Sequence, residues 1–190
     1  MPKTRLKKFV RGEADPLKLT LRDTSILRDV AEFRFLNSEQ LLSLHVGGER
    51  NLKQRLSLLY QHGYLDRPEV QKTARLVSAH IVYSLGRKGA EMLAKDAQER
   101  EGIFRRIREV KHTSPIIAHA MMISQFHVCL TLAVRKQGNI KLTRWTQGND
   151  LKAALRRGEN PELVPDAFFT LDDGNGAVNC FLEADRGTMT

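Results

Sequence analysis

Cysteine is scarce in this sequence, and long apolar runs are missing. The 190 residues include two cysteines, Cys129 and Cys180, far apart and among apolar neighbours. This excludes a disulfide framework and favours a cytoplasmic protein with buried thiols. No uninterrupted run of about 18 apolar residues occurs, so we expect no membrane span. The basic N-terminus lacks the apolar stretch of a secretory signal.

Phosphate-binding loops are missing as well. Neither GxxxxGK[ST] nor GxGxxG occurs, so we expect no nucleotide cofactor and no nucleotide-driven motor. His112, His119 and His127 are spaced by seven and eight residues, whereas zinc sites on one helix use spacings of about three or four. We therefore interpret these histidines as packing or interface residues.

The positive charge is concentrated in the first part of the chain. The net charge is +9, and residues 1–111 contain 23 Lys and Arg against 14 Asp and Glu, while residues 112–190 contain 8 of each. A basic region joined to a neutral one predicts that the first region binds a polyanion. Charge that serves only solubility is the alternative, and the asymmetry favours double-stranded DNA as the partner.

The N-terminal region begins with a basic arm and continues as helices. Residues 1–20 show no periodicity and are predicted to be a flexible arm. Thr24 or Ser25 is the expected cap of a first helix, and Asn37 or Ser38 the expected cap of a second.

A third helix is predicted from residue 49 to a C-cap at Gly63. At 100° per residue, Leu52, Leu56 and Leu59 share its inward face. The opposite face contains basic and polar residues without an acidic one: Arg50, Lys53, Gln54, Ser57 and Gln61. Such side chains reach phosphates and base edges from a helix in the major groove. We predict a DNA-recognition helix, with an ordinary solvated face as the alternative.

After Gly63 the pattern becomes extended. YLDRP and SAHIVYSLG predict a β-hairpin, and a fourth helix follows near Arg87. The hairpin carries basic residues expected to contact phosphates: Arg67, Lys72 and Arg75. This order of elements is that of a winged helix-turn-helix, over residues 21–111, with the hairpin as the wing. Some winged helices bind proteins instead of DNA.

Residues 112–190 predict a second module. A long apolar helix ending at Gly138 precedes a strand, a polar connection and a β-hairpin. We expect most of this helix in the core and regard residues 116–135 as a candidate homodimer interface. The element order is that of the first part of a restriction-endonuclease-like core. The predicted fold class is therefore α+β, a winged helix-turn-helix followed by a partial restriction-endonuclease-like module.

The final hairpin, PDAFFTLDDGNGAVNCFLEADRGT, carries carboxylates at its ends. Asp166 opens its first strand, and Glu183 and Asp185 close its second. Carboxylates on neighbouring strands are the ligands that Mg²⁺ prefers, and a bound metal would activate water. The alternative function is thus a metal-dependent DNA endonuclease or nickase with these three catalytic residues, of which Asp166 and Glu183 would hold Mg²⁺. Asp185 stands where active enzymes of that fold use lysine, so we favour a protein that is not an enzyme, and a salt bridge to Arg186 is the structural alternative.

Several stretches resemble the replication-relaxation family of bacterial plasmids and mobile elements. They are LRDTSILRDVAEFRFLNSEQLLSL, RLSLLYQHGYLDR and VYSLGRKGAEML, together with VPDAFFTLDDGNGAVNCFLEADRGT in the last hairpin. The resemblance covers most of residues 20–188. It implies a winged-helix DNA-binding protein that acts in plasmid replication, in DNA relaxation or in their transcriptional control.

Overall fold

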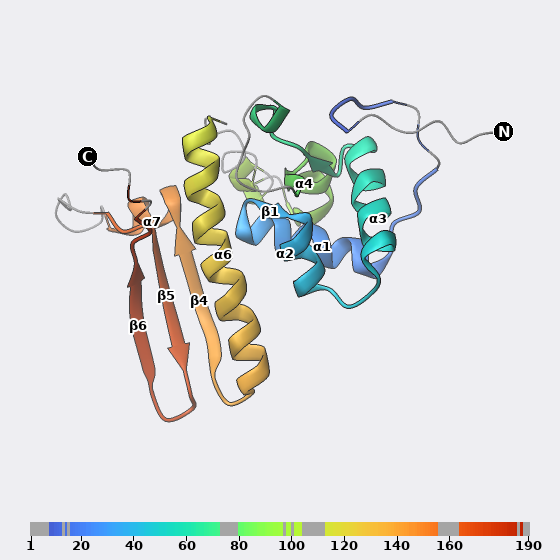
Figure 1. Ribbon diagram of the computed structural model, residues 1–190. Helices are drawn as coiled ribbons and strands as arrows, with labels where there is room; N and C mark the ends of the chain where they lie inside the picture. The colour runs from blue at the N-terminus through green and yellow to red at the C-terminus, as the bar shows by residue number, and fades with distance from the viewer. Residues whose placement is uncertain are drawn as a thin grey trace. The chain divides into compact units, whose positions relative to one another are not determined.

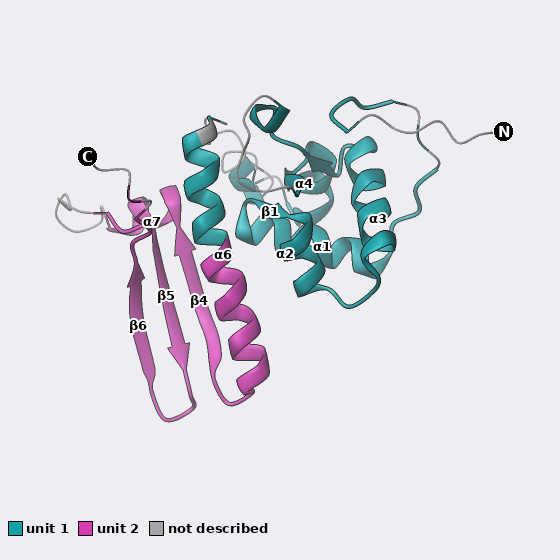
Figure 2. Cartoon of the chain, viewed as in Figure 1, with its two compact units in different colours: residues 1–124 teal, residues 125–190 magenta. Residues whose placement is uncertain are grey.

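The chain forms two compact units. A computed structural model describes residues 8–12, 14, 16–72, 80–96, 98–99, 101–103, 113–155, 164–185 and 187 (Figure 1). The units comprise residues 1–124 and 125–190 (Figure 2). Their boundary lies inside helix α6 (Ser114–Gln137), further along than the predicted boundary at 111/112. Helices combined with small antiparallel sheets make the fold α+β, as predicted.

Unit 1 combines helices with a small sheet. Its elements are α1 (Leu21–Phe33), β1 (Leu36–Asn37), α2 (Ser38–Leu44), α3 (Glu49–Gln61), β2 (Leu65–Asp66), the 3₁₀ helix η1 (Glu69–Lys72), β3 (Val82–Leu85) and α4 (Arg87–Leu93). Strand β3 lies between β1 and β2 and pairs antiparallel with both. The remainder of the predicted hairpin loop, with Arg75, lies outside the described residues.

Capping side chains set where the first two helices begin. Thr20 caps α1, one turn before the predicted Thr24 or Ser25, which is a correction. The reason is a capping box, in which Thr20 Oγ1 accepts from the Asp23 amide (3.3 Å) and the Asp23 carboxylate accepts from the Thr20 amide (2.6 Å). The predicted Asn37 cap of α2 is confirmed.

Glycines shape the connection from α3 to β2. Gly63 has φ +80°, and Tyr64 donates its amide to the carbonyl of Leu59 (2.9 Å), which confirms the predicted glycine C-cap. Gly89 of α4 lies against this turn, because a Cβ at Gly89 would be 2.3 Å from the Tyr64 carbonyl oxygen. Only a glycine lets α4 approach so closely.

The core of unit 1 comes from the apolar stripes of α1, α2 and α3 together with β2. The most deeply buried side chains, at most 1% exposed, include Ile26, Leu27, Val30, Leu41, Leu52, Leu56, Leu59 and Leu65. The stripe predicted for α3 is therefore confirmed. The first part of α6 adds Ile117, which packs with Phe35 and Val82, and Ser124 Oγ donates to the Phe33 carbonyl (3.1 Å).

Unit 2 is a three-stranded antiparallel sheet beside the second half of α6. It contains β4 (Lys141–Gln147), α7 (Gly148–Leu155), β5 (Ala167–Asp172) and β6 (Ala177–Leu182), with the strand order β4-β5-β6. The strands were predicted, whereas α7 replaces part of the predicted polar connection. Leu151 anchors α7, being 3% exposed.

An aromatic cluster joins α6 to the sheet within unit 2. The ring of His127 stacks on Trp145 with centroids 3.7 Å apart, and Phe169 lies 5.6 Å from Trp145. Phe126 covers Phe169 at 5.7 Å. His127 is 1% exposed, so its predicted packing role is confirmed.

Helix α6 is less buried than its apolar sequence predicts. By length and composition, the segment Pro115–Gln137 could cross a membrane, and 22% of its most apolar window is buried. A single helix of this kind is weak evidence for a membrane span, since core helices pass the same test. The prediction that most of α6 is core is wrong, because the helix presents only one face to its packing partners and leaves Ile116, Met122 and Phe126 exposed.

A buried ion pair fixes α3 against α1. Asp23 is fully buried, and its carboxylate accepts from Arg55 Nε (2.7 Å) and Nη2 (2.5 Å). Burial raises the pKa of Asp23, but the hydrogen bonds from Arg55 and Thr20 and the charge of Arg55 outweigh it, so the pKa lies below its ordinary value.

Replacing Asp23 by Ala should lower the free energy of unfolding by about 2–3 kcal/mol at neutral pH, because Arg55 loses its partner and α1 its capping box. A carboxyl with a depressed pKa stabilises the fold above its unfolded pKa, and this stabilisation is lost as pH falls through the folded pKa. Urea denaturation of both proteins should therefore show the difference shrinking below about pH 4. If the variant lost as much stability below about pH 4 as it does at neutral pH, the ionised carboxylate would not be the stabilising group.

Candidate functional site

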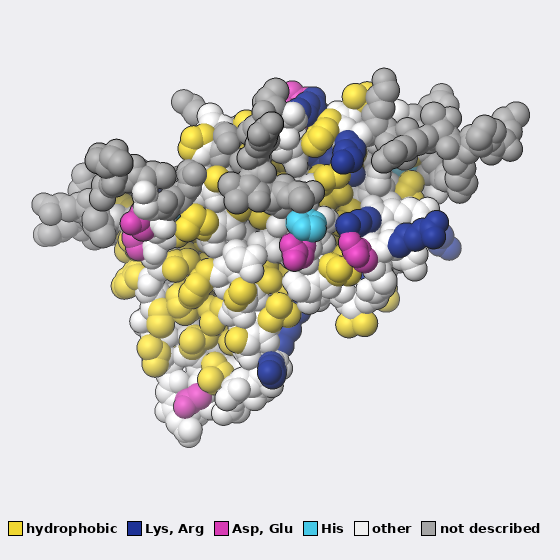
Figure 3. Space-filling model, viewed as in Figure 1, with side chains coloured by type: hydrophobic (Ala, Val, Ile, Leu, Met, Phe, Trp, Pro, Cys, Tyr) yellow, Lys and Arg dark blue, Asp and Glu magenta, His cyan; other side chains and the backbone are white. Residues whose placement is uncertain are grey.

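The outward face of α3 is basic and exposed. Arg50, Lys53 and Gln54 are exposed, and Ser57 is half-buried. They lie opposite Leu52 and Leu56, which are buried in the core. Most Lys and Arg side chains visible in Figure 3 lie over unit 1. The structure thus brings together the first four residues of the predicted recognition face.

Lys53 is engaged by a carboxylate at the edge of this face. Its ammonium forms an ion pair with Glu49, one turn earlier on α3. The hydrogen bond from Lys53 and its charge hold the pKa of Glu49 below its ordinary value. The sequence-based view of a face without acidic influence missed this pair, although the i,i+4 spacing of Glu49 and Lys53 signals it. A phosphate that binds Lys53 must compete with Glu49.

Arg67 lies in the interior, where the hairpin prediction expected a phosphate contact. It is 5% exposed, and its guanidinium lies 4.1 Å from the ring centre of Tyr60 and 5.1 Å from that of Tyr83. It donates to Tyr83 Oη (3.2 Å) and to the carbonyl of Lys8. Burial raises the pKa of Tyr83, which keeps its hydroxyl neutral. This corrects the predicted exposure of Arg67, because two aromatic rings from separate elements enclose it.

Gln61 is also withdrawn from solvent. It is 7% exposed, its Oε1 accepts from the Gly12 amide (2.8 Å), and its Nε2 donates to the Val10 carbonyl (3.2 Å). Arg11 completes this contact by donating to the carbonyls of Tyr60 (3.0 Å) and Leu65 (3.2 Å). The prediction of a flexible arm is therefore corrected for residues 8–12, which are docked on unit 1.

Lys72 remains at the surface of the predicted wing. It ends the short helix η1, is exposed, and pairs with Glu69 (2.6 Å). Gln71 ties this helix to β3, because its amide exchanges two hydrogen bonds with the backbone of Val82 (both 3.0 Å). The short helix that carries Lys72 is thus held next to β3.

The acidic residues of the last hairpin lie at one end of its ladder. Asp166 precedes β5, and its Oδ2 accepts from the Ala184 amide (2.8 Å), next to Glu183. Glu183 and Asp185 are exposed and follow the end of β6. The carboxylate of Asp185 accepts from the Gly187 amide (2.8 Å). Among the described residues, no group of three or more His, Cys, Asp or Glu side chains could hold a metal ion. Arg186 lies outside them.

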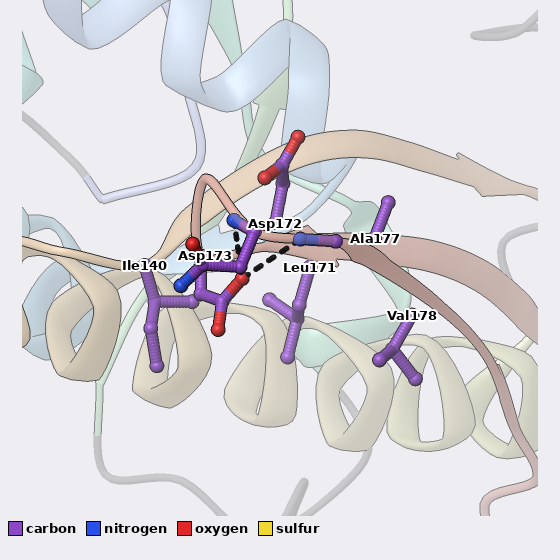
Figure 4. Close-up of a pocket in the computed structure, with 8 residues that line it drawn as sticks. Ile140, Leu171, Asp172, Asp173, Ala177 and Val178 are labelled. Atoms are coloured by element: carbon purple, nitrogen blue, oxygen red, sulfur yellow. Dashed lines mark hydrogen bonds between the residues drawn. The ribbon is translucent and has the colours of Figure 1, made fainter.

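A shallow pocket lies at the opposite end of the hairpin (Figure 4). Ile140, Leu171 and Val178 form its apolar side. The carboxylate of Asp173 accepts from the amides of Asn175 (2.9 Å) and Gly176 (3.0 Å), which lowers its pKa. These bonds close the turn, so we interpret Asp173 as a structural residue.

Comparison with known proteins places the chain in a family. The model of the replication-relaxation family matches residues 27–190, from within α1 to the last residue. The chain belongs to the replication-relaxation family. This membership confirms the resemblance and connects the protein with the replication of plasmids or mobile elements. No curated protein and no solved structure matches it.

In this replication-relaxation protein, Arg67→Ala should lower the free energy of unfolding by about 2 kcal/mol, because a buried cation between two rings is removed. Lys72→Ala removes an exposed cation from the same segment and should leave stability unchanged. Urea denaturation of both variants makes the comparison. Equal stability of the two would mean that Arg67 is a surface residue after all.

Proposed function

We propose that unit 1 is a winged helix-turn-helix that binds double-stranded DNA in the replication of a plasmid or mobile element. The observation that carries this proposal is α3, whose one face is buried in the core while the other exposes Arg50, Lys53 and Gln54. Arg and Gln can contact base edges, and Lys can contact phosphates. Membership of the replication-relaxation family supports the role in replication.

The neighbouring elements support the same function. Helix α2 precedes α3 with a short connection, and β2 and β3 follow it as an antiparallel pair. This is the order in which a recognition helix is followed by a wing. Lys72, exposed between these strands, would contact the phosphate backbone beside the groove that α3 enters.

The nuclease alternative receives no specific support from the hairpin. Asp166 uses one carboxylate oxygen to hold the Ala184 amide, and an aspartate, Asp185, occupies the position of the expected lysine. The Mg²⁺ site and the homodimer stay predictions. We base the function on unit 1 alone.

Arg50→Ala combined with Lys53→Ala should weaken binding to a fluorescent duplex of mixed sequence by at least about tenfold at physiological salt. Fluorescence anisotropy measures the affinity, and circular dichroism should show an unchanged fold, because both side chains are exposed. Arg135→Ala with Lys136→Ala removes the same charge from α6 and should change affinity much less. If both double variants bind alike, α3 is not the contact surface.

Glu49→Gln should tighten binding to the same duplex several-fold. The substitution removes the carboxylate that competes with phosphate for Lys53 and also a negative charge beside the DNA. Glu91→Gln breaks another exposed i,i+4 pair, with Arg87 on α4, and serves as the control, with no comparable gain. An affinity of Glu49→Gln at or below that of the unaltered protein would argue against a phosphate at Lys53.

A further inference from the structure

The N-terminal segment 8–12 has a docking site built from α3, β2 and the residue after β2. Two backbone groups of the segment bind Gln61, and the guanidinium of Arg11 reaches the backbone at the end of α3 and on β2. Arg67 donates to the carbonyl of Lys8. Arg11 also pairs with Asp66 (3.2 Å). Figure 1 shows the segment, in dark blue, next to the end of α3.

The docking site lies on the outward face of α3. At 100° per residue, Gln61 points to the same side as Arg50, Gln54 and Ser57. Since Gln61 holds both Val10 and Gly12, the segment crosses the last turn of that face. A duplex that contacts the first turns of α3 would therefore lie close to the segment.

The segment places two basic side chains beside the outward face of α3. Lys8 is exposed, and the side chain of Arg11 is 46% exposed despite its contacts. Residues 1–12 contain five Lys and Arg and no Asp or Glu.

Phosphates attract such a segment because each neutralised phosphate releases condensed counterions. A free arm would lose conformational entropy when it bound DNA, whereas a segment already held at residues 8–12 loses less. Docking therefore lowers the entropic cost of using Lys8 and Arg11 as phosphate contacts.

We propose that the docked N-terminal segment is a second DNA-binding element, which presents Lys8 and Arg11 to phosphates beside the α3 contact. Gln61, Arg11 and Arg67 are positioning residues for this element. The inference rests on the proposed DNA binding of unit 1 and extends that contact surface.

Two variants of the full chain test it. The charge variant, Lys8→Gln, removes an exposed charge of the docked segment. The release variant, Gln61→Leu, keeps every charge but removes two hydrogen bonds to the segment. Faster hydrogen exchange at the Gly12 amide and faster trypsin cleavage after Lys8 report the release.

Affinity for a duplex of mixed sequence is measured over a range of salt concentrations. For the charge variant, the slope of log Kobs against log salt should become shallower by about 0.9 for each lost phosphate contact. The release variant should also bind more weakly with a shallower slope, although its charge is unchanged. The Arg50→Ala, Lys53→Ala protein provides the reference loss for α3.

The outcomes separate this inference from the proposed function. If the charge variant keeps the original affinity and slope while the α3 variant loses binding, the segment is no DNA-binding element and α3 remains the contact. Tighter binding by Gln61→Leu would mean that the segment covers the face, which also overturns the inference. If the unaltered protein shows no salt-dependent affinity for DNA, the proposed function fails and the inference fails with it. If hydrogen exchange at the Gly12 amide is unchanged in Gln61→Leu, the segment has not been released. The affinity and salt slope of the charge variant then decide whether the segment binds DNA.

Discussion

The carboxylate of Asp23 is the interaction on which the arrangement of unit 1 depends. It accepts from the Thr20 amide and hydroxyl, which begins α1, and from the Arg55 guanidinium, which belongs to α3. Arg55 also donates to the Lys18 carbonyl (2.5 Å). The Asp23–Arg55 pair therefore ties the Lys18 backbone, the start of α1 and the middle of α3 together. A buried charge needs such partners, so the pair favours one orientation of α3 about its own axis.

The orientation of α3 could be predicted from the sequence, because it depends on the spacing of residues within the helix. Leu52, Leu56 and Leu59 recur at helical spacing, and their burial decides which side of α3 faces solvent. Gly63 was predictable for a similar reason, since a helix end in the left-handed region favours glycine. The α+β class and the strands of the last hairpin followed from patterns of the same short range.

The residues that sequence reasoning placed wrongly are those whose surroundings come from distant parts of the chain. Gln61 lies on the polar face of α3, and only the docking of residues 10–12, about fifty positions away, explains its burial. Arg67 is a basic residue in a predicted wing, yet Tyr60 and Tyr83 enclose it. Periodicity records which way a side chain points but not what covers it. The cap at Thr20 is a different kind of miss, because the capping box with Asp23 is visible in the sequence.

The structure also changes what the excess of positive charge means. Arg55 is neutralised by Asp23, so it adds little to the field at the surface. Arg67 forms no ion pair with a carboxylate among the described residues, since its partners are aromatic rings, a hydroxyl and a carbonyl. Its guanidinium therefore lies among aromatic rings, where it cannot touch a phosphate. The excess of positive charge is thus partly structural, because Arg55 holds α3 against α1 and Arg67 holds the carbonyl of Lys8. Neither side chain adds a surface contact for a polyanion, so the exposed cations of unit 1 matter more than the total charge.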